Sequence, residues 1–205
     1  MNKRNYQKEL DKIIEGLDNR PRLLLHSCCA PCSSYCLEYL SEYFEITDYY
    51  YNPNITSQAE YDMRSSEQER LISELNEDLG SDISCVLGTY EPEIFYDKVK
   101  GLEAEPEGGK RCMVCFALRL ESTAAYAREH GYDYFTTTLT ISPLKNAHAL
   151  NEIGMAIGQK YGVAFLPSDF KKRNGYKRSI ELSKQYDLYR QSYCGCEFSR
   201  TNEDE

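Results

Sequence analysis

The sequence predicts a single α/β domain over residues 1–205, with one doubly wound, mostly parallel sheet and a C-terminal Cys-Gly-Cys tail. Three observations predict this fold class. Short apolar runs alternate with longer segments of helical apolar spacing. The 205 residues suffice for one domain with a core, without a repeat or a low-complexity linker. Short apolar strands joined by helices indicate a parallel sheet that is covered on both faces.

The first half of the chain is predicted to contain three strands and four helices. The first helix ends before Pro21, and the second strand ends in the turn sequence Asn52-Pro53-Asn54. Strands are expected at residues 23–25, 45–51 and 83–87, and helices at 6–17, 34–43, 58–79 and 93–100.

The second half begins with a predicted loop over 103–110, which contains Pro106, Gly108 and Gly109. Helices are expected at 112–130, 146–161 and 174–189, strands at 132–138 and 163–166, and a frayed polar end at 200–205. Ligands of such folds bind beyond the carboxyl ends of the strands. The loops after the first, second and fourth strands are therefore expected to share one side of the sheet.

The composition indicates a cytoplasmic protein. No run of about 18 apolar residues suggests a membrane span, and residues 1–11 lack the apolar core of a signal peptide. Nine cysteines in a compartment that keeps thiols reduced indicate metal or redox chemistry rather than structural disulfides. The net charge of −9 argues against nucleic-acid binding unless basic residues gather locally.

Two groups of cysteines lie at predicted element ends. Cys112 and Cys115 form a CxxC at a helix N-terminus, where the partial positive charge of the helix favours thiolates. Cys28 and Cys29 follow the first strand. On a straight strand they would point to opposite faces, whereas in a loop both could turn toward one metal centre, with Cys32 as a third candidate.

The third group is Cys194-Gly195-Cys196, in which the glycine lets the backbone fold tightly enough for the two sulfurs to approach. A disulfide across one residue would be strained and easily reduced, which suits a redox couple; the same pair could instead bind metal. Cys36, one turn into a helix, and Cys85, within a strand, are predicted to be core residues.

Three pairs provide six thiolates, which exceeds the four that one structural zinc ion uses. A [4Fe-4S] cluster with four cysteine ligands, plus two thiols for electron transfer or a second metal, would account for all six.

Five motifs stand in the chain in this order: His26-Ser27-Cys28-Cys29-Ala30-Pro31-Cys32, Tyr51-Asn52-Pro53-Asn54-Ile55, Arg111-Cys112-Met113-Val114-Cys115, Thr138-Leu139-Thr140-Ile141-Ser142-Pro143-Leu144-Lys145-Asn146 and Tyr193-Cys194-Gly195-Cys196. Together they resemble the QueH family of epoxyqueuosine reductases, which act in queuosine biosynthesis. The resemblance covers nearly the whole chain.

The resemblance implies an oxidoreductase that removes the epoxide oxygen of epoxyqueuosine at the wobble position of certain tRNAs, giving queuosine and water. It implies a fold similar to that of the adenine-nucleotide α-hydrolases (the HUP-like fold). In those relatives a glycine-containing phosphate loop follows the first strand. Residues 27–31 occupy this place here without a glycine, so ATP use is not expected.

The resemblance also implies cofactors and partners. The partners are tRNA, through its anticodon loop, and an electron donor that the sequence does not identify. The resemblance leaves two uses for Cys194 and Cys196, a disulfide or the binding of a further, mononuclear iron. Cys32 is an optional ligand, because the matching family position can be aspartate. The implied [4Fe-4S] ligands are Cys28, Cys29, Cys112 and Cys115, and the implied redox-active pair is Cys194 and Cys196.

Reduction of an epoxide to an alkene also needs two protons. Because the substrate is part of a tRNA, the protein must in addition bind RNA. The proton-donor candidates by position are His26, Asp48, Tyr51 and Tyr193. Asn52 and Asn54 are candidates for contact with the flipped nucleoside. The candidates for contact with RNA phosphates and bases are Lys171, Lys172, Arg173, Lys177 and Arg178, together with Tyr176 and Lys145, although a solvated helix face would explain the same cluster.

Two other functions fit parts of the pattern. A thiol–disulfide oxidoreductase acting on proteins would use Cys112/Cys115 or Cys194/Cys196, but it leaves Cys28-Cys29 unexplained. A zinc-stabilised RNA-binding module without catalysis would contain one zinc ion and no labile sulfide.

Overall fold

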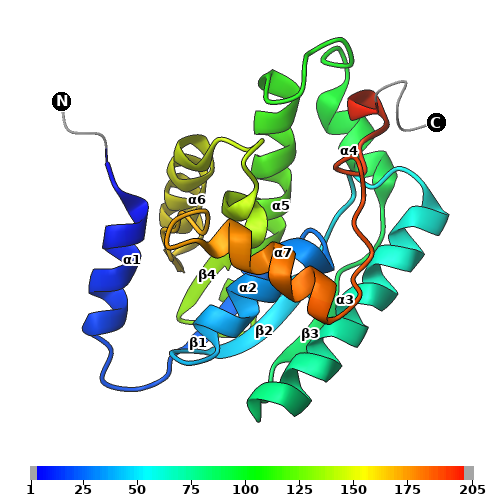
Figure 1. Ribbon diagram of the computed structural model, residues 1–205. Coiled ribbons are helices and arrows are strands. Elements are labelled where there is room, and N and C mark those ends of the chain that lie inside the picture. Colours follow the sequence, from blue (N-terminus) through cyan, green and yellow to red (C-terminus); the bar gives the residue numbers. More distant parts are fainter. Residues whose placement is uncertain (1–3, 201–205) are drawn as a thin grey trace.

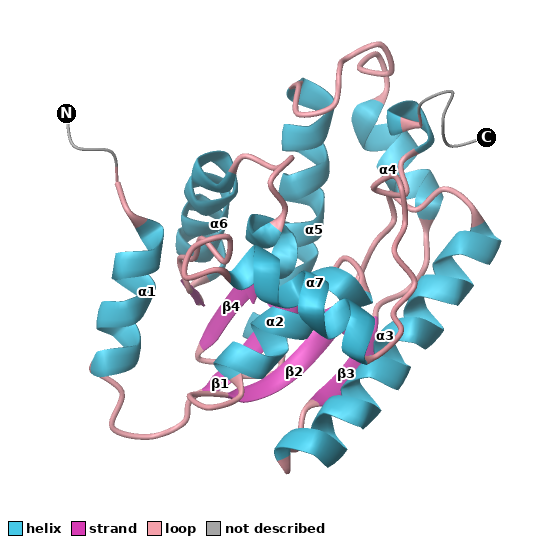
Figure 2. Cartoon of the chain, viewed as in Figure 1, coloured by secondary structure: helices cyan, strands magenta, loops and turns pink. Residues whose placement is uncertain are grey.

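The computed structural model describes residues 4–200 and confirms the predicted α/β class (Figures 1 and 2). Five strands form one all-parallel sheet in the order β3-β2-β1-β4-β5, which is consistent with a doubly wound, HUP-like fold. The strands are β1 (Arg22–His26), β2 (Glu45–Tyr50), β3 (Ser84–Leu87), β4 (Tyr134–Thr137) and β5 (Ala164–Phe165).

Helices cover both faces of this sheet, because buried apolar side chains of two helix groups pack against it. Core residues of α1, α2, α3 and α7 form one cluster, and those of α5 and α6 form another. The helices are α1 (Tyr6–Glu15), α2 (Ala30–Leu40), α3 (Gln58–Leu79), α4 (Pro92–Val99), α5 (Lys110–Glu129), α6 (Ala147–Tyr161) and α7 (Gly175–Gln185), with the 3-10 turns η1 (Thr138–Ile141) and η2 (Glu197–Ser199). Within residues 4–200, none of these helices has the length and apolar character needed to cross a membrane.

Most predicted elements agree with the structure within two residues, and three element ends show how the chain departs from the prediction. Helix α2 begins at Ala30 rather than near residue 34, because Pro31 occupies its first turn, where a missing N–H costs nothing. The strand predicted to reach residue 138 gives way to η1. Helix α7 ends at Gln185 rather than 189, and Asp187 has a positive φ of 46°. The predicted frayed end lies, except for Arg200, outside the described residues.

Polar side chains are buried at the carboxyl end of the central strands. Asp48 on β2 is fully buried and accepts a short hydrogen bond from the Ser27 hydroxyl. Burial raises the pKa of Asp48 to about 7, because a carboxylate loses its hydration there. Between about pH 4 and 7, Asp48 therefore keeps its proton in the folded chain. In the unfolded chain the same carboxyl has its ordinary pKa of 3.8 and has already released the proton.

We expect Asp48→Asn to change how the free energy of unfolding depends on pH. The stability that the protonated Asp48 contributes is full below about pH 4 and is lost as the pH rises through 7, with a slope of up to about 1.4 kcal/mol per pH unit. The variant should therefore gain stability relative to wild type between pH 4.5 and 7.5 in urea unfolding of the reduced, metal-free chain. Burial lowers the pKa of His26 to about 3, so its contribution to stability depends on pH in the opposite sense. This contribution is the same in both proteins and cancels in the difference between their free energies of unfolding. A difference that does not vary with pH would contradict the prediction.

Candidate metal and redox site

The turn after β1 brings three cysteine sulfurs together. The sulfurs of Cys28, Cys29 and Cys32 all lie within 4.8 Å of one another, and those of Cys28 and Cys29 are 3.7 Å apart. Cys29 is the N-cap of α2, so Cys32 stands in the first turn of that helix. The predicted convergence of adjacent cysteines is confirmed, and Cys32 belongs to the same group. Such a group of three thiols could hold a metal ion.

Cys28 is the most anionic of the three thiols. Hydrogen bonds from Cys29 and Cys32 lower the pKa of Cys28 well below its usual value, and the nearby Lys145 ammonium acts in the same direction. The Thr138 hydroxyl, on η1, also lies 3.6 Å from the Cys28 sulfur and donates to it. The pKa of Cys32 is raised because it shares its hydrogen with Cys28.

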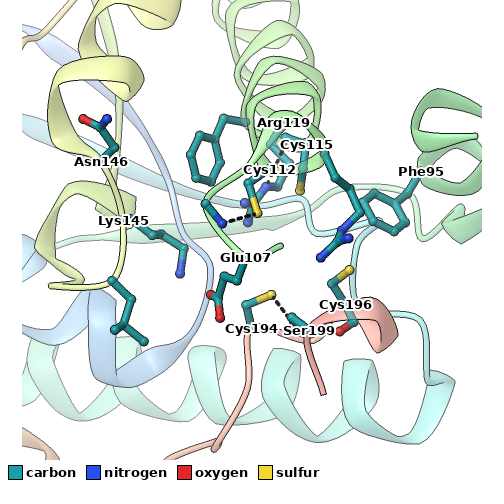
Figure 3. Close-up of a pocket in the computed structure, with 14 residues that line it drawn as sticks. Phe95, Glu107, Cys112, Cys115, Arg119, Lys145, Asn146, Cys194, Cys196 and Ser199 are labelled. Atoms are coloured by element: carbon teal, nitrogen blue, oxygen red, sulfur yellow. Dashed lines mark hydrogen bonds between the residues drawn. The ribbon is translucent and has the colours of Figure 1, made fainter. Parts of the chain in front are cut away.

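A second group of sulfurs surrounds a pocket between α5 and the C-terminal tail (Figure 3). The enclosed cavity is small, about 30 Å³, and lies within a wider hollow of about 480 Å³ that includes open solvent. Cys112 and Cys115 face it from the first turns of α5, and the N–H of Gly108 donates to the Cys112 sulfur over 3.2 Å. The pocket is lined by Phe95, Glu107, Gly108, Arg111, Cys112, Cys115, Phe116, Arg119, Leu144, Lys145, Asn146, Cys194, Cys196 and Ser199.

The Cys-Gly-Cys tail is fixed against the segment that follows β2. The Asn54 side chain donates to the Cys194 carbonyl over 3.1 Å, and the Thr56 N–H donates to the Gly195 carbonyl over 3.1 Å. Gly195 has a φ of +98°, and a Cβ there would lie 2.7 Å from the Ile55 side chain. Only glycine fits both conditions.

The two tail thiols lie in different surroundings. Both line the pocket, but the Cys194 sulfur is 3.0 Å from the Ser199 hydroxyl, whereas Cys196 is 5% exposed and packs with Phe95 and Val99. A hydrogen bond from Cys196 lowers the pKa of Cys194, and the same bond and burial raise the pKa of Cys196. Cys194 is thus the thiolate that faces the pocket.

The predicted nucleoside contacts of Asn52 and Asn54 are not supported by the geometry. Both side chains are buried, at 2% and 1% exposure. Asn52 donates to the Ser27 carbonyl over 2.8 Å, and Asn54 donates to the tail. Their amide N–H groups connect the turn after β1, the turn after β2 and the tail, so these donors are committed to the backbone. Asn52 Oδ1 accepts from Arg119, and Asn54 Oδ1 is buried without a hydrogen-bond partner among the described residues.

The predicted proton donors also lie elsewhere. His26 is fully buried, with Nε2 donating to the Tyr51 carbonyl over 3.1 Å and Nδ1 2.9 Å from the Thr137 hydroxyl. Asp48 faces Ser27. The Tyr51 ring stacks on Tyr49, and the Tyr193 hydroxyl accepts a hydrogen bond from Arg200. None of the four lines the pocket, whereas the carboxyl of Glu107 does.

Most of the predicted RNA-binding cations are paired with carboxylates. Arg173 lies 2.7 Å from Asp11, Arg178 lies 2.6 Å from Glu38, and Lys171 lies 3.2 Å from Asp169. Lys145 is not on this surface but in the pocket. The cluster therefore offers less free positive charge than its sequence indicates.

The two cysteines predicted to be core residues do pack against the core. Cys36 is fully buried, and Cys85 is partly buried against the same cluster. Burial raises the pKa of both thiols.

The sequence prediction missed Arg119, which is 3% exposed and lines the pocket. A signal for it was available in the spacing. Cys112, Cys115 and Arg119 stand at positions i, i+3 and i+7 of one helix and therefore share a face.

Comparison with known proteins supports the motif pattern. The family model described as Epoxyqueuosine reductase QueH matches residues 23–202. A protein of that name from Staphylococcus epidermidis is 50% identical over 200 residues, covering 95% of this chain and 84% of its own length. One from Streptococcus pyogenes is 46% identical over 198 residues, covering 95% and 78%. One from Thermotoga maritima is 38% identical over 183 residues, covering 86% and 89%.

We expect Asn54→Ala to loosen the tail. Loss of one buried hydrogen bond of about 1 kcal/mol should speed amide exchange roughly fivefold in residues 193–199 and at Thr56. Hydrogen–deuterium exchange with mass spectrometry measures this. Asn146→Ala is the matched control, because Asn146 caps α6 and should affect only the start of that helix. Equal exchange of the tail in wild type and Asn54→Ala would show that the amide does not hold it.

Proposed function

This chain belongs to the QueH family of epoxyqueuosine reductases, which are oxidoreductases, and on that premise we propose that it reduces epoxyqueuosine in tRNA to queuosine. The observation that carries the proposal is the arrangement of seven cysteines in two groups. Three have their sulfurs together after β1, and four line the pocket.

The reaction sets an electron balance that these thiols can meet. Removal of the epoxide oxygen as water consumes two electrons and two protons and leaves a carbon–carbon double bond. Oxidation of the Cys194 thiolate and the Cys196 thiol to a disulfide releases two electrons and one proton, so one pair supplies the electrons for one epoxide and the second proton comes from solvent. We propose this pair as the redox-active couple. Its support is the tight turn at Gly195 and the exposure of Cys194 to the pocket.

The remaining thiols suit an iron–sulfur cluster. We propose Cys28, Cys29, Cys112 and Cys115 as ligands of a [4Fe-4S] cluster. Thiolates are the donors that such clusters use, and the N–H of Gly108 bonded to Cys112 is a contact typical of cluster sulfur ligands. Cys32 would serve as a further ligand or hold a mononuclear iron. When bound, the cluster supplies electrons one at a time at low potential.

The chain's own residues have defined tasks in this proposal. The modified nucleoside, flipped out of the anticodon loop, binds at the open side of the pocket. Leu144, which is 73% exposed at its edge, offers an apolar contact to a base. The hydrogen bond from Cys196 and the charge of Lys145 together favour the thiolate form of Cys194. An unidentified electron donor restores the dithiol after each reaction.

Metal and sulfide analysis after anaerobic purification tests the cofactor. We expect about four iron atoms and four labile sulfides per chain, with a broad visible absorbance near that of other [4Fe-4S] proteins. One zinc ion without sulfide would favour the RNA-binding alternative. A metal-free protein that reduces protein disulfides would favour the thiol–disulfide oxidoreductase.

Single cysteine variants separate the two sets of thiols. Cys112→Ser should lose the cluster, because one ligand is removed. Cys194→Ser and Cys196→Ser should keep iron and sulfide but lose conversion of epoxyqueuosine in tRNA, measured by mass spectrometry of the digested RNA. Cys36→Ser, which alters a buried cysteine outside the site, is the control for general thiol loss. Full conversion by Cys194→Ser would remove the redox pair from the proposal.

A further inference from the structure

Arg119 is a buried cation without a carboxylate partner among the residues that the structure describes. Its Nε donates to the Cys115 carbonyl and its Nη1 to Asn52 Oδ1, both over 3.4 Å, and its guanidinium lies over the Phe116 ring. None of these groups is an anion. A guanidinium keeps its charge under all physiological conditions, and a buried charge without a counter-ion is strongly unfavourable. An anion is therefore needed near Arg119.

Thiols are the groups that can supply this negative charge. Arg119 projects from the same face of α5 as Cys112 and Cys115 (Figure 3). Arg119 lines the same pocket as these two cysteines. Its Nη1 donates to Asn52, whose amide holds the Ser27 carbonyl in the turn after β1. Arg119 thus lies between the α5 sulfurs and the turn that carries the other sulfur group.

Lys145 approaches the same sulfurs from the loop before α6. Its side chain lines the pocket together with those of Cys112, Cys115 and Cys194 (Figure 3). Glu107, an exposed carboxyl, lines the same pocket. Two cations from separate elements therefore face one set of thiols.

We propose that Arg119 and Lys145 are the counter-charges of the thiolate-bound cluster and that together they raise its reduction potential. The inference rests on the proposed cluster and goes beyond it by assigning two non-ligand residues. A cluster held by four thiolates is anionic and gains a further negative charge on reduction. A nearby fixed cation therefore stabilises the reduced form more than the oxidised form, most strongly where water is excluded.

The test is a potentiometric titration of the cluster in the purified holoprotein, followed by electron paramagnetic resonance. In Arg119→Gln and in Lys145→Met, the ratio of reduced to oxidised cluster at a fixed potential should fall at least tenfold, which equals 59 mV for one electron. Arg119→Lys keeps the charge and should restore most of the wild-type potential. Lys172→Met removes an exposed lysine outside the pocket and should change nothing.

The outcomes distinguish this inference from the function on which it rests. A wild-type protein without a cluster would refute the proposed function itself. A normal cluster whose potential is unchanged in Lys145→Met and Arg119→Gln would overturn only the counter-charge assignment. Weaker tRNA binding by these variants at an unchanged potential would assign both cations to the substrate instead. Lys145→Met decides the question if Arg119→Gln fails to fold, because Lys145 is partly exposed at the pocket edge.

Discussion

The site depends on hydrogen bonds that fix the turn after β1 to the strands on both sides of it. His26 bridges Thr137, at the end of β4, and the Tyr51 carbonyl, just after β2. Asn52 holds the Ser27 carbonyl from the β2 side. Because β1 is the central strand of an all-parallel sheet, its carboxyl end has a neighbour on each side. Adjacent cysteines that would diverge on a free strand are thereby held with their sulfurs together.

Charge is balanced locally rather than by the chain as a whole. The protein carries a net charge of −9, yet its most anionic thiols, Cys28 and Cys194, lie beside Lys145, and a second cation is buried at Arg119. Elsewhere, cations that look free in the sequence are paired, as Arg173 is with Asp11. The pocket and the surface ion pairs are separate environments. An acidic protein can therefore keep cations in its pocket, since salt screens the interaction between charges that are more than about 10 Å apart.

Local patterns predicted the strands, their parallel arrangement and the location of the cysteines, because periodicity and turn residues act within a few positions. Contacts between distant segments were not predictable in this way. The sequence places Asn54 among the candidates for substrate contact, because a local pattern cannot reveal that its side chain bonds to Cys194, 140 positions away. The ion pairs of the basic segment involve carboxylates on α1 and α2, which only the tertiary fold brings near. Arg119 is different: the sequence prediction missed it, although its helical spacing from Cys112 indicates that both residues share a face of α5.

The anchored tail gives the protein a fixed order of assembly during its own synthesis. Domains form from the N-terminus as the chain emerges from the ribosome at about 5–20 residues per second. The thiols of Cys28, Cys29, Cys112 and Cys115 are therefore made several seconds before the Cys194 segment that closes the pocket. During that interval the nascent chain exposes thiols that the finished fold partly covers. The fold itself gives these thiols no protection until the tail has been made.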